Sequence, residues 1–381
     1  MAIEDQELET LRIRIDQIDR TIVDNLRQRA GVVKQIKLYK QERGLPVWDP
    51  ARESELLAEL MRGEYSPLPA VAIKHIFTEI ISACREMQRS IRVSYLGPES
   101  TFSHVAALDR FGHSAEFVPK DSIREVFREV ENGRSDYGVV PVENSTEGTV
   151  GVTLDQFFGS SLKICGETYL RVSHALLSLE TDMSKIKRVM SHPQPLGQCL
   201  DWLAQNLPTG ALVPTSSTAA AAARAAQEPG SAAIGHELLG EKFKLNVLAQ
   251  DIQDRSVNLT RFLIVGLAEC RPTGRDKTSI WFMASHRPGT LYNTLKPLAN
   301  LGINLTRIES RPSIRGPWEY AFFLDFEGHA QEPTIKAALD QLRQVVESLT
   351  ILGSYPMADP NGSQALEVAP WSRGLSASSV D

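Results

Sequence analysis

The sequence predicts a multidomain protein made of an all-α unit, an α/β unit and a smaller βαββαβ unit. A length of 381 residues fits two or three domains. Residues 1–90 contain only helical patterns, and helical and strand patterns alternate over residues 91–269. Residues 277–356 then show the order strand, helix, strand, strand, helix, strand, which is the ferredoxin-like arrangement. Three packed units therefore follow one another along the chain.

The N-terminal unit begins with one long helix over residues 5–42. Its apolar residues recur at steps of three and four, at Leu8, Leu11, Ile15, Ile18, Ile22, Leu26, Val33 and Ile36. A helix of this length cannot bury such a stripe against itself, so it needs short partner helices, a second chain, or both. Asp49 and Pro50 suit the start of a second helix. Pro67 and Pro69 end that helix, and a third is expected over 70–89.

The later segments are separated by changes in composition. Residues 270–276 are expected to form a linker between the α/β unit and the βαββαβ unit. Residues 357–381 are rich in Ser, Gly, Pro and Ala, which predicts a disordered tail.

Composition argues against several classes of function. The net charge of -6 argues against a nucleic-acid-binding surface, and no apolar run reaches the roughly 18 residues that a membrane span needs. The N-terminus is acidic and lacks the apolar stretch of a signal peptide. Four widely spaced cysteines without a C-x-x-C pair predict neither a zinc site nor a disulfide framework. We therefore expect a cytoplasmic protein without a cofactor, a metal, a membrane or a nucleic-acid partner.

Cations on the first helix suggest a site for a small dianion. Arg29 and Lys40 are 11 residues apart, so they share a face and lie roughly 16 Å apart along the axis. Arg12 lies 17 residues before Arg29, roughly 25 Å away along the same helix. It can join the same site only from an antiparallel partner helix, which predicts an interlocked homodimer.

Several motifs of this unit resemble the all-helical class of chorismate mutases over the first 90 residues. They are L-R-x-x-I-x-x-I-D at 11–19, Arg29, Lys40, D-P-x-R-E at 49–53 and I-I-S-A-C-R-E-M-Q at 80–88. The resemblance implies that Arg29 and the partner subunit's Arg12 grip the substrate carboxylates, with Arg52 in support. The other implied contacts are Lys40 and Gln88 with the ether oxygen, Asp49 and Glu53 with the ring hydroxyl, and Cys84 at a position where the family often has Ser.

Four segments of the middle unit lie where an α/β sheet binds ligands. They are 97–103, 140–149, 191–195 and 258–262, and three of them are loops at strand ends. Together and in this order they resemble prephenate dehydratase over roughly 180 residues. That family implies two lobes like those of periplasmic binding proteins, with prephenate in the cleft between them.

The dehydratase resemblance also assigns residues. Thr260, in the T-R-F motif, matches the residue regarded as essential in the family. The cleft would be lined by Glu143, Asn144, Ser191, His192 and Gln194. Arg261 would serve either the substrate carboxylates or the loop structure, and Phe262 completes the motif.

Two motifs of the βαββαβ unit resemble those of ACT domains. Residues 287–292 read R-P-G-T-L-Y, where the family usually has G-A-L-V, and residues 309–312 read E-S-R-P. The implied effector is L-phenylalanine, held between two such domains. The implied effector-binding residues are Gly289, Thr290, Leu291, Glu309, Ser310, Arg311 and Pro312. A purely structural dimerisation domain is the alternative.

Taken together, the resemblances imply a bifunctional enzyme that converts chorismate to prephenate and then to phenylpyruvate, under feedback inhibition by phenylalanine. One alternative keeps this enzyme class but takes arogenate as the substrate of the second reaction. Another is a two-lobed small-molecule sensor without turnover.

Overall fold

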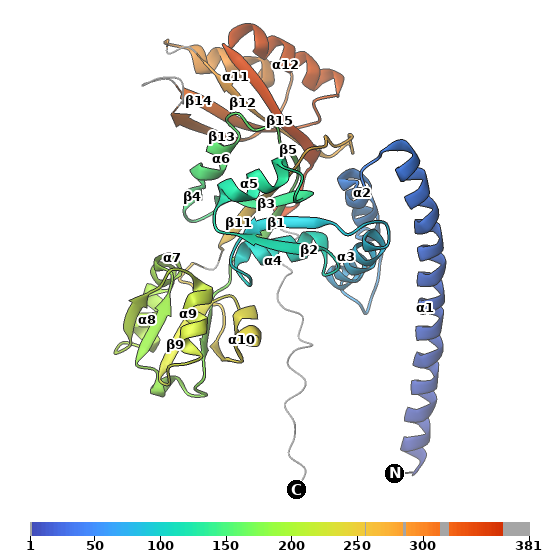
Figure 1. Ribbon diagram of the computed structural model, residues 1–381, viewed down its shortest axis with the longest axis vertical. Helices are drawn as coiled ribbons and strands as arrows, with labels where there is room; N and C mark the ends of the chain where they lie inside the picture. The colour runs from blue at the N-terminus through green and yellow to red at the C-terminus, as the bar shows by residue number, and fades with distance from the viewer. Residues whose placement is uncertain (1, 256, 285–286, 313–319, 361–381) are drawn as a thin grey trace.

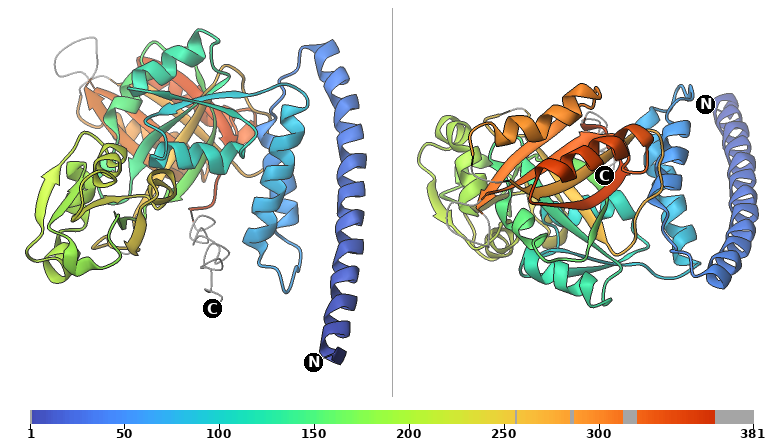
Figure 2. Two further views of the ribbon diagram at one scale, coloured as in Figure 1. Left: turned by 60° about the horizontal axis from the view of Figure 1, so that its bottom comes forward. Right: turned by 90° about the horizontal axis from the view of Figure 1, so that it is seen from above.

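A computed structural model describes residues 2–255, 257–284, 287–312 and 320–360. It contains the three predicted units, and the mixed fold class is confirmed (Figures 1 and 2). Most of the tail that we predicted to be disordered, 361–381, lies outside the described residues. In the described part of the chain, no helix is long and apolar enough to cross a membrane.

The N-terminal helical unit consists of α1 (Ala2–Arg43), α2 (Pro50–Leu60) and α3 (Ala70–Glu86). Asp49 caps α2 by accepting a hydrogen bond from the backbone N–H of Arg52 at 2.9 Å. Helix α1 runs alongside α2 and α3 and stands free of the rest of the molecule (Figure 1). Most of its apolar stripe is therefore uncovered: Ile15 and Ile18 are each more than half exposed, whereas Val33 near α3 is buried.

The α/β unit has two lobes. The first lobe contains β1 (Arg92–Leu96), α4 (Phe102–Phe111), β2 (Glu116–Lys120), α5 (Ile123–Glu131), β3 (Tyr137–Asn144), β4 (Gly148–Thr149), α6 (Gly151–Gln156), β5 (Lys163–Arg171) and β11 (Leu259–Gly266). Its sheet has the order β2-β1-β3-β11-β5, and β4 pairs with β3. Strand β11 returns from the second lobe and lies antiparallel between β3 and β5, which places Thr260 opposite Asn144.

The second lobe is a separate sheet with the order β10-β6-β9-β7-β8. Its elements are β6 (Ala175–Ser178), the 3-10 helix η1 (Met183–Lys185), β7 (Arg188–Ser191), α7 (Pro193–Gln198), α8 (Leu200–Asn206), β8 (Ala211–Pro214), α9 (Thr218–Ala225), β9 (Ser231–Gly235), α10 (Leu238–Phe243) and β10 (Asn246–Ala249). The chain passes between the lobes twice, after β5 and before β11, so the predicted two-lobed architecture is present.

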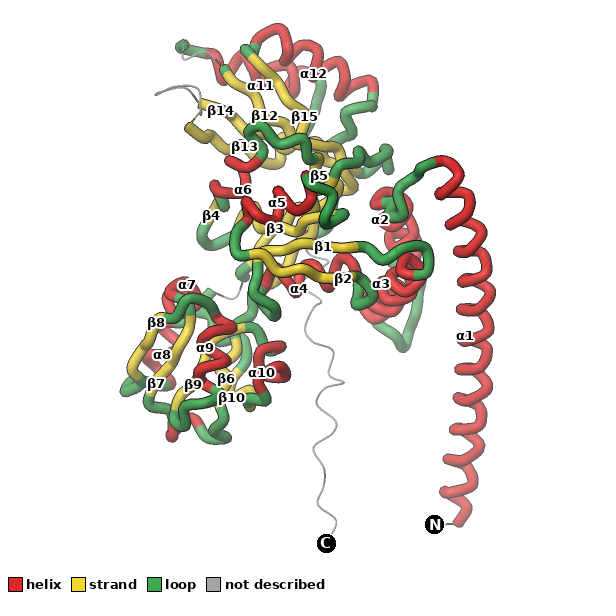
Figure 3. Tube along the Cα trace, viewed as in Figure 1, coloured by secondary structure: helices red, strands yellow, loops and turns green. Residues whose placement is uncertain are grey.

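The C-terminal unit contains β12 (Asp276–Met283), α11 (Thr290–Asn300), β13 (Leu305–Pro312), β14 (Tyr320–Glu327), α12 (Pro333–Val345) and β15 (Ser348–Pro356). Its sheet has the order β13-β14-β12-β15, and α11 and α12 cover one face (Figure 3). The other face packs against the first lobe. There a Cβ at Gly353 would lie 2.3 Å from the Ile164 carbonyl oxygen, so only glycine permits this approach of β15 to β5.

Candidate active sites and regulatory interface

Several predicted mutase residues meet where the C-terminal half of α1 faces the end of α3. The Arg29 guanidinium donates to Cys84 Sγ at 2.6 Å. Lys40 Nζ donates to the Val47 carbonyl oxygen at 2.7 Å. Burial lowers the pKa of Lys40, and the nearby Asp49 carboxylate partly opposes that shift. The structure thus pairs Arg29 with Cys84 and, farther along α1, places Lys40 near Asp49.

The buried carboxylate of Glu53 departs from the expected role. Its two oxygens pair with Arg110 of α4 at 2.5 Å and with Arg85 at 3.4 Å. Both oxygens are therefore used at the boundary with the first lobe, and in this arrangement Glu53 does not face a substrate hydroxyl. The sequence could not reveal this, because Arg110 lies 57 residues away.

The remaining predicted mutase residues lie apart from this pairing. Arg52 is mostly exposed and lies 4.0 Å from Glu55. Gln88 Oε1 is buried and has no hydrogen-bond partner among the described residues. Arg12 is exposed on the free part of α1, where it lies 3.6 Å from Glu9. Within one chain Arg12 does not join the other cations, as the helix length requires.

The hydroxyl of Thr260 lies in a polar cluster at the edge of the first lobe that faces the second. Asn144 Nδ2 donates to Thr260 Oγ1 at 2.9 Å and to Asn258 Oδ1 at 2.7 Å. Asn144 Oδ1 in turn accepts from the Thr146 and Glu147 backbone N–H groups. Since Thr260 Oγ1 accepts from Asn144, its own proton is free to be donated to a ligand.

The second lobe contributes residues that the sequence motifs missed. Gln198 Nε2 donates to Glu147 Oε1 of the first lobe at 2.7 Å, and Gln198 Oε1 lies 2.8 Å from His174 Nε2. Asn258 also donates to Gln198 Oε1, at 3.3 Å. Gln198 thus links the second lobe to the first beside the Thr260 cluster. Its only sequence signal was its place four residues after Gln194 on the same short helix.

Two histidines also lie at this boundary, the buried His174 and the half-buried His236. Phe102 of the first lobe contacts the edges of His174 and His236, with ring centroids 5.5 Å apart in both pairs. Burial lowers the pKa of His174, and the hydrogen bond that its Nε2 donates to Gln198 Oε1 partly opposes this shift. Burial also lowers the pKa of His236 to about 4, so both imidazoles are neutral at pH 7.

The S-H-P-Q segment, residues 191–194, lies in the second lobe at the start of α7, and its side chains differ in burial and in hydrogen bonding. Ser191 is fully buried and its hydroxyl donates to the Ile234 carbonyl oxygen at 2.7 Å. His192 caps α7, with Nδ1 accepting from the Gln194 backbone N–H at 3.4 Å. The Gln194 side chain is exposed. Ser191 and His192 therefore shape the start of α7.

Glu143, which was expected in the cleft, faces elsewhere, and so do Arg261 and Phe262 of the T-R-F motif. Glu143 and Arg261 are paired across β3 and β11, one residue from Asn144 and Thr260 respectively, so they project from the opposite face of the sheet. There Glu143 lies 3.4 Å from Arg307 of the C-terminal unit. Phe262 follows a register shift in β11 and is buried in the core of the first lobe. The expectation that Glu143 lines the cleft is corrected, and Arg261, whose role was left open between substrate and structure, lies on the side of the C-terminal unit.

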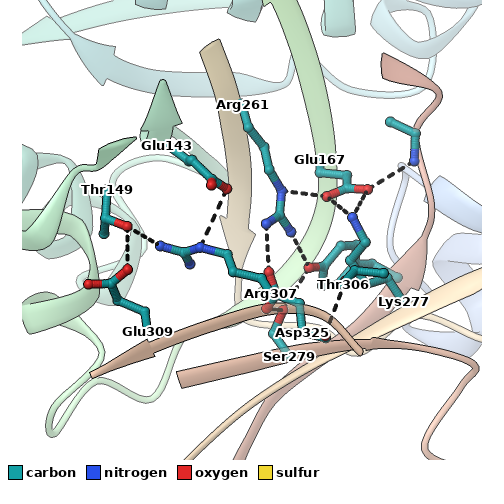
Figure 4. A network of polar contacts seen from close by, with 12 residues as sticks. Glu143, Thr149, Glu167, Arg261, Lys277, Ser279, Thr306, Arg307, Glu309 and Asp325 are labelled. Atoms are coloured by element: carbon teal, nitrogen blue, oxygen red, sulfur yellow. Dashed lines mark hydrogen bonds and ion pairs between the residues drawn. The ribbon is translucent and has the colours of Figure 1, made fainter. Parts of the chain in front are cut away.

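Arg261 forms the centre of a buried polar network between the first lobe and the C-terminal unit (Figure 4). It donates to Glu167 at 2.7 Å, to Asp325 at 2.6 Å and to the Tyr355 hydroxyl at 3.0 Å. Lys277 adds a second cation on Glu167. Although burial alone would raise the pKa of Asp325, the charge of Arg261 and its neighbours lowers it. Arg261 therefore serves structure and domain contact.

The two ACT-like motifs are placed differently. Gly289 has φ +80 and precedes α11, followed by Thr290 and Leu291, and only the Asn293 amide lies near its Cβ position. Glu309 and Arg311 point from β13 toward the first lobe. Glu309 accepts from the Thr149 hydroxyl at 2.6 Å, and Arg311 donates twice to Asp155 at 3.1 and 2.7 Å. Ser310 and Pro312 are exposed on the same strand. Two of the seven predicted effector residues, Glu309 and Arg311, thus contact the α/β unit.

Among the described residues, no group of three or more His, Cys, Asp or Glu side chains could hold a metal ion. The chemistry available at the two clusters is that of fixed cations around α1 and of oriented hydroxyl and amide groups around Thr260.

Comparisons with known proteins cover each unit. Residues 11–89 match the family chorismate mutase type II, residues 93–270 match prephenate dehydratase and residues 280–344 match the ACT domain. The L-Phe complex of a prephenate dehydratase from Arthrobacter aurescens is similar with a TM-score of 0.66 and 35% identity, over 71% of this chain and 91% of that one.

Relatives that align over almost the whole chain combine the chorismate mutase and prephenate dehydratase activities in their names. A bifunctional chorismate mutase/prephenate dehydratase from Aquifex aeolicus is 43% identical over 93% of this chain and 99% of its own. One from Pseudomonas aeruginosa is 44% identical over 94% of this chain and 100% of its own. The chain belongs to the bifunctional chorismate mutase/prephenate dehydratase family.

Proposed function

We propose that the protein rearranges chorismate to prephenate in its helical domain and converts prephenate to phenylpyruvate in its two-lobed domain, with L-phenylalanine as inhibitor. The observation that carries the proposal is the Thr260 hydroxyl, which Asn144 orients at the boundary between the lobes. A separate cluster of cations around Arg29 and Lys40 serves the first reaction.

The rearrangement needs a compact substrate conformer and positive charge where the breaking ether bond becomes negative. Arg29 holds a carboxylate, and Lys40 and Gln88 hydrogen-bond the ether oxygen. An ether oxygen can only accept a hydrogen bond, so Gln88 would donate to it from its side-chain amide Nε2. Asp49 lies near Lys40 and takes the ring hydroxyl. Arg52 and Cys84 support the carboxylate side.

The first site is complete only in a homodimer. The exposed stripe of α1 pairs with the same stripe of a second chain in antiparallel orientation. This places the partner subunit's Arg12 beside Arg29. The half-exposed Ile15 and Ile18 side chains support this pairing, because uncovered apolar rows of this length mark interaction surfaces.

In the second reaction prephenate loses carbon dioxide and its ring hydroxyl. The electron pair of the broken bond to the carboxylate enters the ring as the C–O bond breaks, and the departing hydroxyl takes up a proton from solvent to become water. Thr260 donates a hydrogen bond to that hydroxyl from its O–H as it leaves. A threonine has too high a pKa to act as a strong acid, so it acts as a positioned donor. The new aromatic ring supplies much of the driving force. Asn144, Asn258 and Gln198 fix the donor and close the cleft around the substrate.

Phenylalanine would bind at the N-terminus of α11 between two ACT domains. Gly289 leaves space above the first backbone N–H groups, which favour a carboxylate. Support for this effector comes from the L-Phe complex of the similar dehydratase. Because Glu309 and Arg311 contact the dehydratase domain, an effector that shifts β13 reaches that domain directly.

One assay tests the proposal. Purified protein is given chorismate, prephenate or arogenate, and phenylpyruvate or phenylalanine is measured with and without added phenylalanine. We expect phenylpyruvate from both chorismate and prephenate, with inhibition by phenylalanine. Faster turnover of arogenate would move the second reaction to that substrate. Binding of prephenate without turnover would identify the two-lobed domain as a sensor.

A further inference from the structure

Arg307 of the ACT domain lies between two residues of a hairpin in the dehydratase domain (Figure 4). Its Nε lies 3.4 Å from Glu143 Oε2, and its terminal nitrogen donates to the Thr149 hydroxyl at 3.0 Å. The same hydroxyl donates to Glu309, two residues along β13 from Arg307. Strand β13 of the ACT domain therefore contacts both ends of one hairpin.

The two faces of this hairpin, residues 143–149, contact different parts of the molecule. Glu143 pairs with Thr149 across β3 and β4, and both face the ACT domain. Asn144 pairs with Gly148 and faces Thr260. The Glu147 side chain at the turn holds Gln198 of the second lobe. A movement of one side must move the other, because adjacent residues of a strand share one backbone.

Arg307 reaches the hairpin from a largely buried position. The side chain is only 8% exposed, and Nε, although near Glu143, has no aligned hydrogen bond among the described residues. Its charge also helps to lower the pKa of the buried Asp325, after the larger effect of Arg261. A buried guanidinium with one loosely aligned contact can form a different bond after a small shift of β13, which is what a two-state coupling requires.

We propose that Arg307 is a positioning residue for the dehydratase reaction and transmits the state of the ACT domain to Thr260 through the hairpin 143–149. It touches neither substrate nor effector. Held by Arg307, the hairpin keeps Asn144 on Thr260 and Glu147 on Gln198. When β13 shifts, Arg307 moves the hairpin with it, and the contacts of Asn144 with Thr260 and of Glu147 with Gln198 are lost. This proposal rests on the dehydratase activity and the phenylalanine inhibition proposed above. It adds the residues through which the inhibition reaches Thr260.

The test uses the full-length protein with Arg307→Met, Arg307→Lys and Thr149→Val. The matched control is Arg343→Met, which removes an ACT-domain arginine that pairs with Asp340 on the exposed side of α12. For each variant we would measure mutase turnover, dehydratase kcat and KM, inhibition at saturating phenylalanine, and phenylalanine binding by calorimetry.

We expect Arg307→Met to lower dehydratase kcat about 5- to 20-fold with a smaller change in KM. It should also leave more residual activity at saturating phenylalanine, while phenylalanine still binds and mutase turnover is kept. Arg307→Lys should recover part of the kcat, and Thr149→Val should show the same pattern more weakly. Arg343→Met should behave as the parent protein.

Unchanged kcat and an unchanged inhibition curve in Arg307→Met would overturn the proposal. If that variant fails to fold and loses mutase turnover as well, Thr149→Val decides, because it keeps every charge in place; parental behaviour of Thr149→Val would then reject the route. If phenylalanine does not bind the parent protein, the proposed sensor function fails, while the kcat comparison still tests the positioning role.

Discussion

Neighbouring residues on β11 serve different domains. Thr260 faces the cleft, Arg261 faces the ACT domain, and Phe262 enters the core after a register shift. Strand alternation could have separated Thr260 from Arg261 in advance. The shift after Arg261 could not be predicted, because nothing in the local sequence marks it. Motifs therefore predicted which residues matter, and long-range contacts decided what each one does.

Replacing Thr260 by valine removes the hydroxyl and keeps the shape of the side chain. We expect dehydratase kcat to fall about 100- to 1000-fold, because one positioned donor typically contributes this much. Mutase turnover should stay within about twofold, since the Arg29 cluster is separate. Rates of phenylpyruvate and prephenate formation measure both effects. Equal loss of the two activities would argue for a shared site.

Replacing Lys40 by methionine removes a positive charge and keeps the length of the side chain. Since Lys40 acts on charge that develops only in the transition state, mutase kcat should fall about 100-fold or more, with a smaller change in KM. Steady-state kinetics with chorismate separate the two constants. A change in KM alone would contradict the role of Lys40.

Acid should weaken the fold through His236. Its pKa is about 4 in the folded protein against an ordinary value of 6.5, so the unfolded chain binds more protons between these values. The stabilisation is complete above pH 6.5 and is lost as the pH falls toward 4, by about 2 kcal/mol between pH 7 and pH 5. Between pH 7 and pH 5, the thermal midpoint of His236→Asn should fall less than that of the parent protein. Equal losses would mean that another group carries the effect.

At the scale of elements, the domain order was predictable and the packing between domains was not. The βαββαβ order and the long apolar stripe of α1 follow from periodicity. The approach of β15 to β5 depends on Gly353 and on backbone atoms of Ile164, nearly 200 residues apart. Glu53 similarly found its partner Arg110 across a domain boundary. Such pairings need tertiary contacts that no local pattern contains.

Gly353→Ala tests the contact between the two sheets. The added Cβ would meet the Ile164 carbonyl oxygen at 2.3 Å, so strands β15 and β5 must separate. Overpacking of this kind costs about 1–3 kcal/mol, and we expect a lower thermal midpoint with weaker inhibition by phenylalanine. Gly31→Ala, whose Cβ meets nothing within 4 Å, is the matched control. An unchanged midpoint in Gly353→Ala would show that the interface is loose.

At the scale of the whole molecule, α1 leaves one chain incomplete. The substitution Ile18→Glu places a charge in the middle of the apolar stripe and should dissociate the proposed dimer. Most mutase turnover should then be lost, because Arg12 no longer reaches the mutase site of a second chain. The dehydratase site lies in the other domain and should keep activity. Light scattering after size exclusion gives the mass. A parent protein that is monomeric with full mutase activity would refute the shared site.

The central claim is that one chain holds two separate sites that act in sequence. The most direct measurement gives chorismate to the Thr260→Val protein, follows prephenate and phenylpyruvate, and then adds the Lys40→Met protein. We predict that prephenate accumulates first and is converted to phenylpyruvate after the addition, because each variant supplies the activity that the other lacks. Phenylpyruvate before the addition, or no phenylpyruvate after it, would contradict the account.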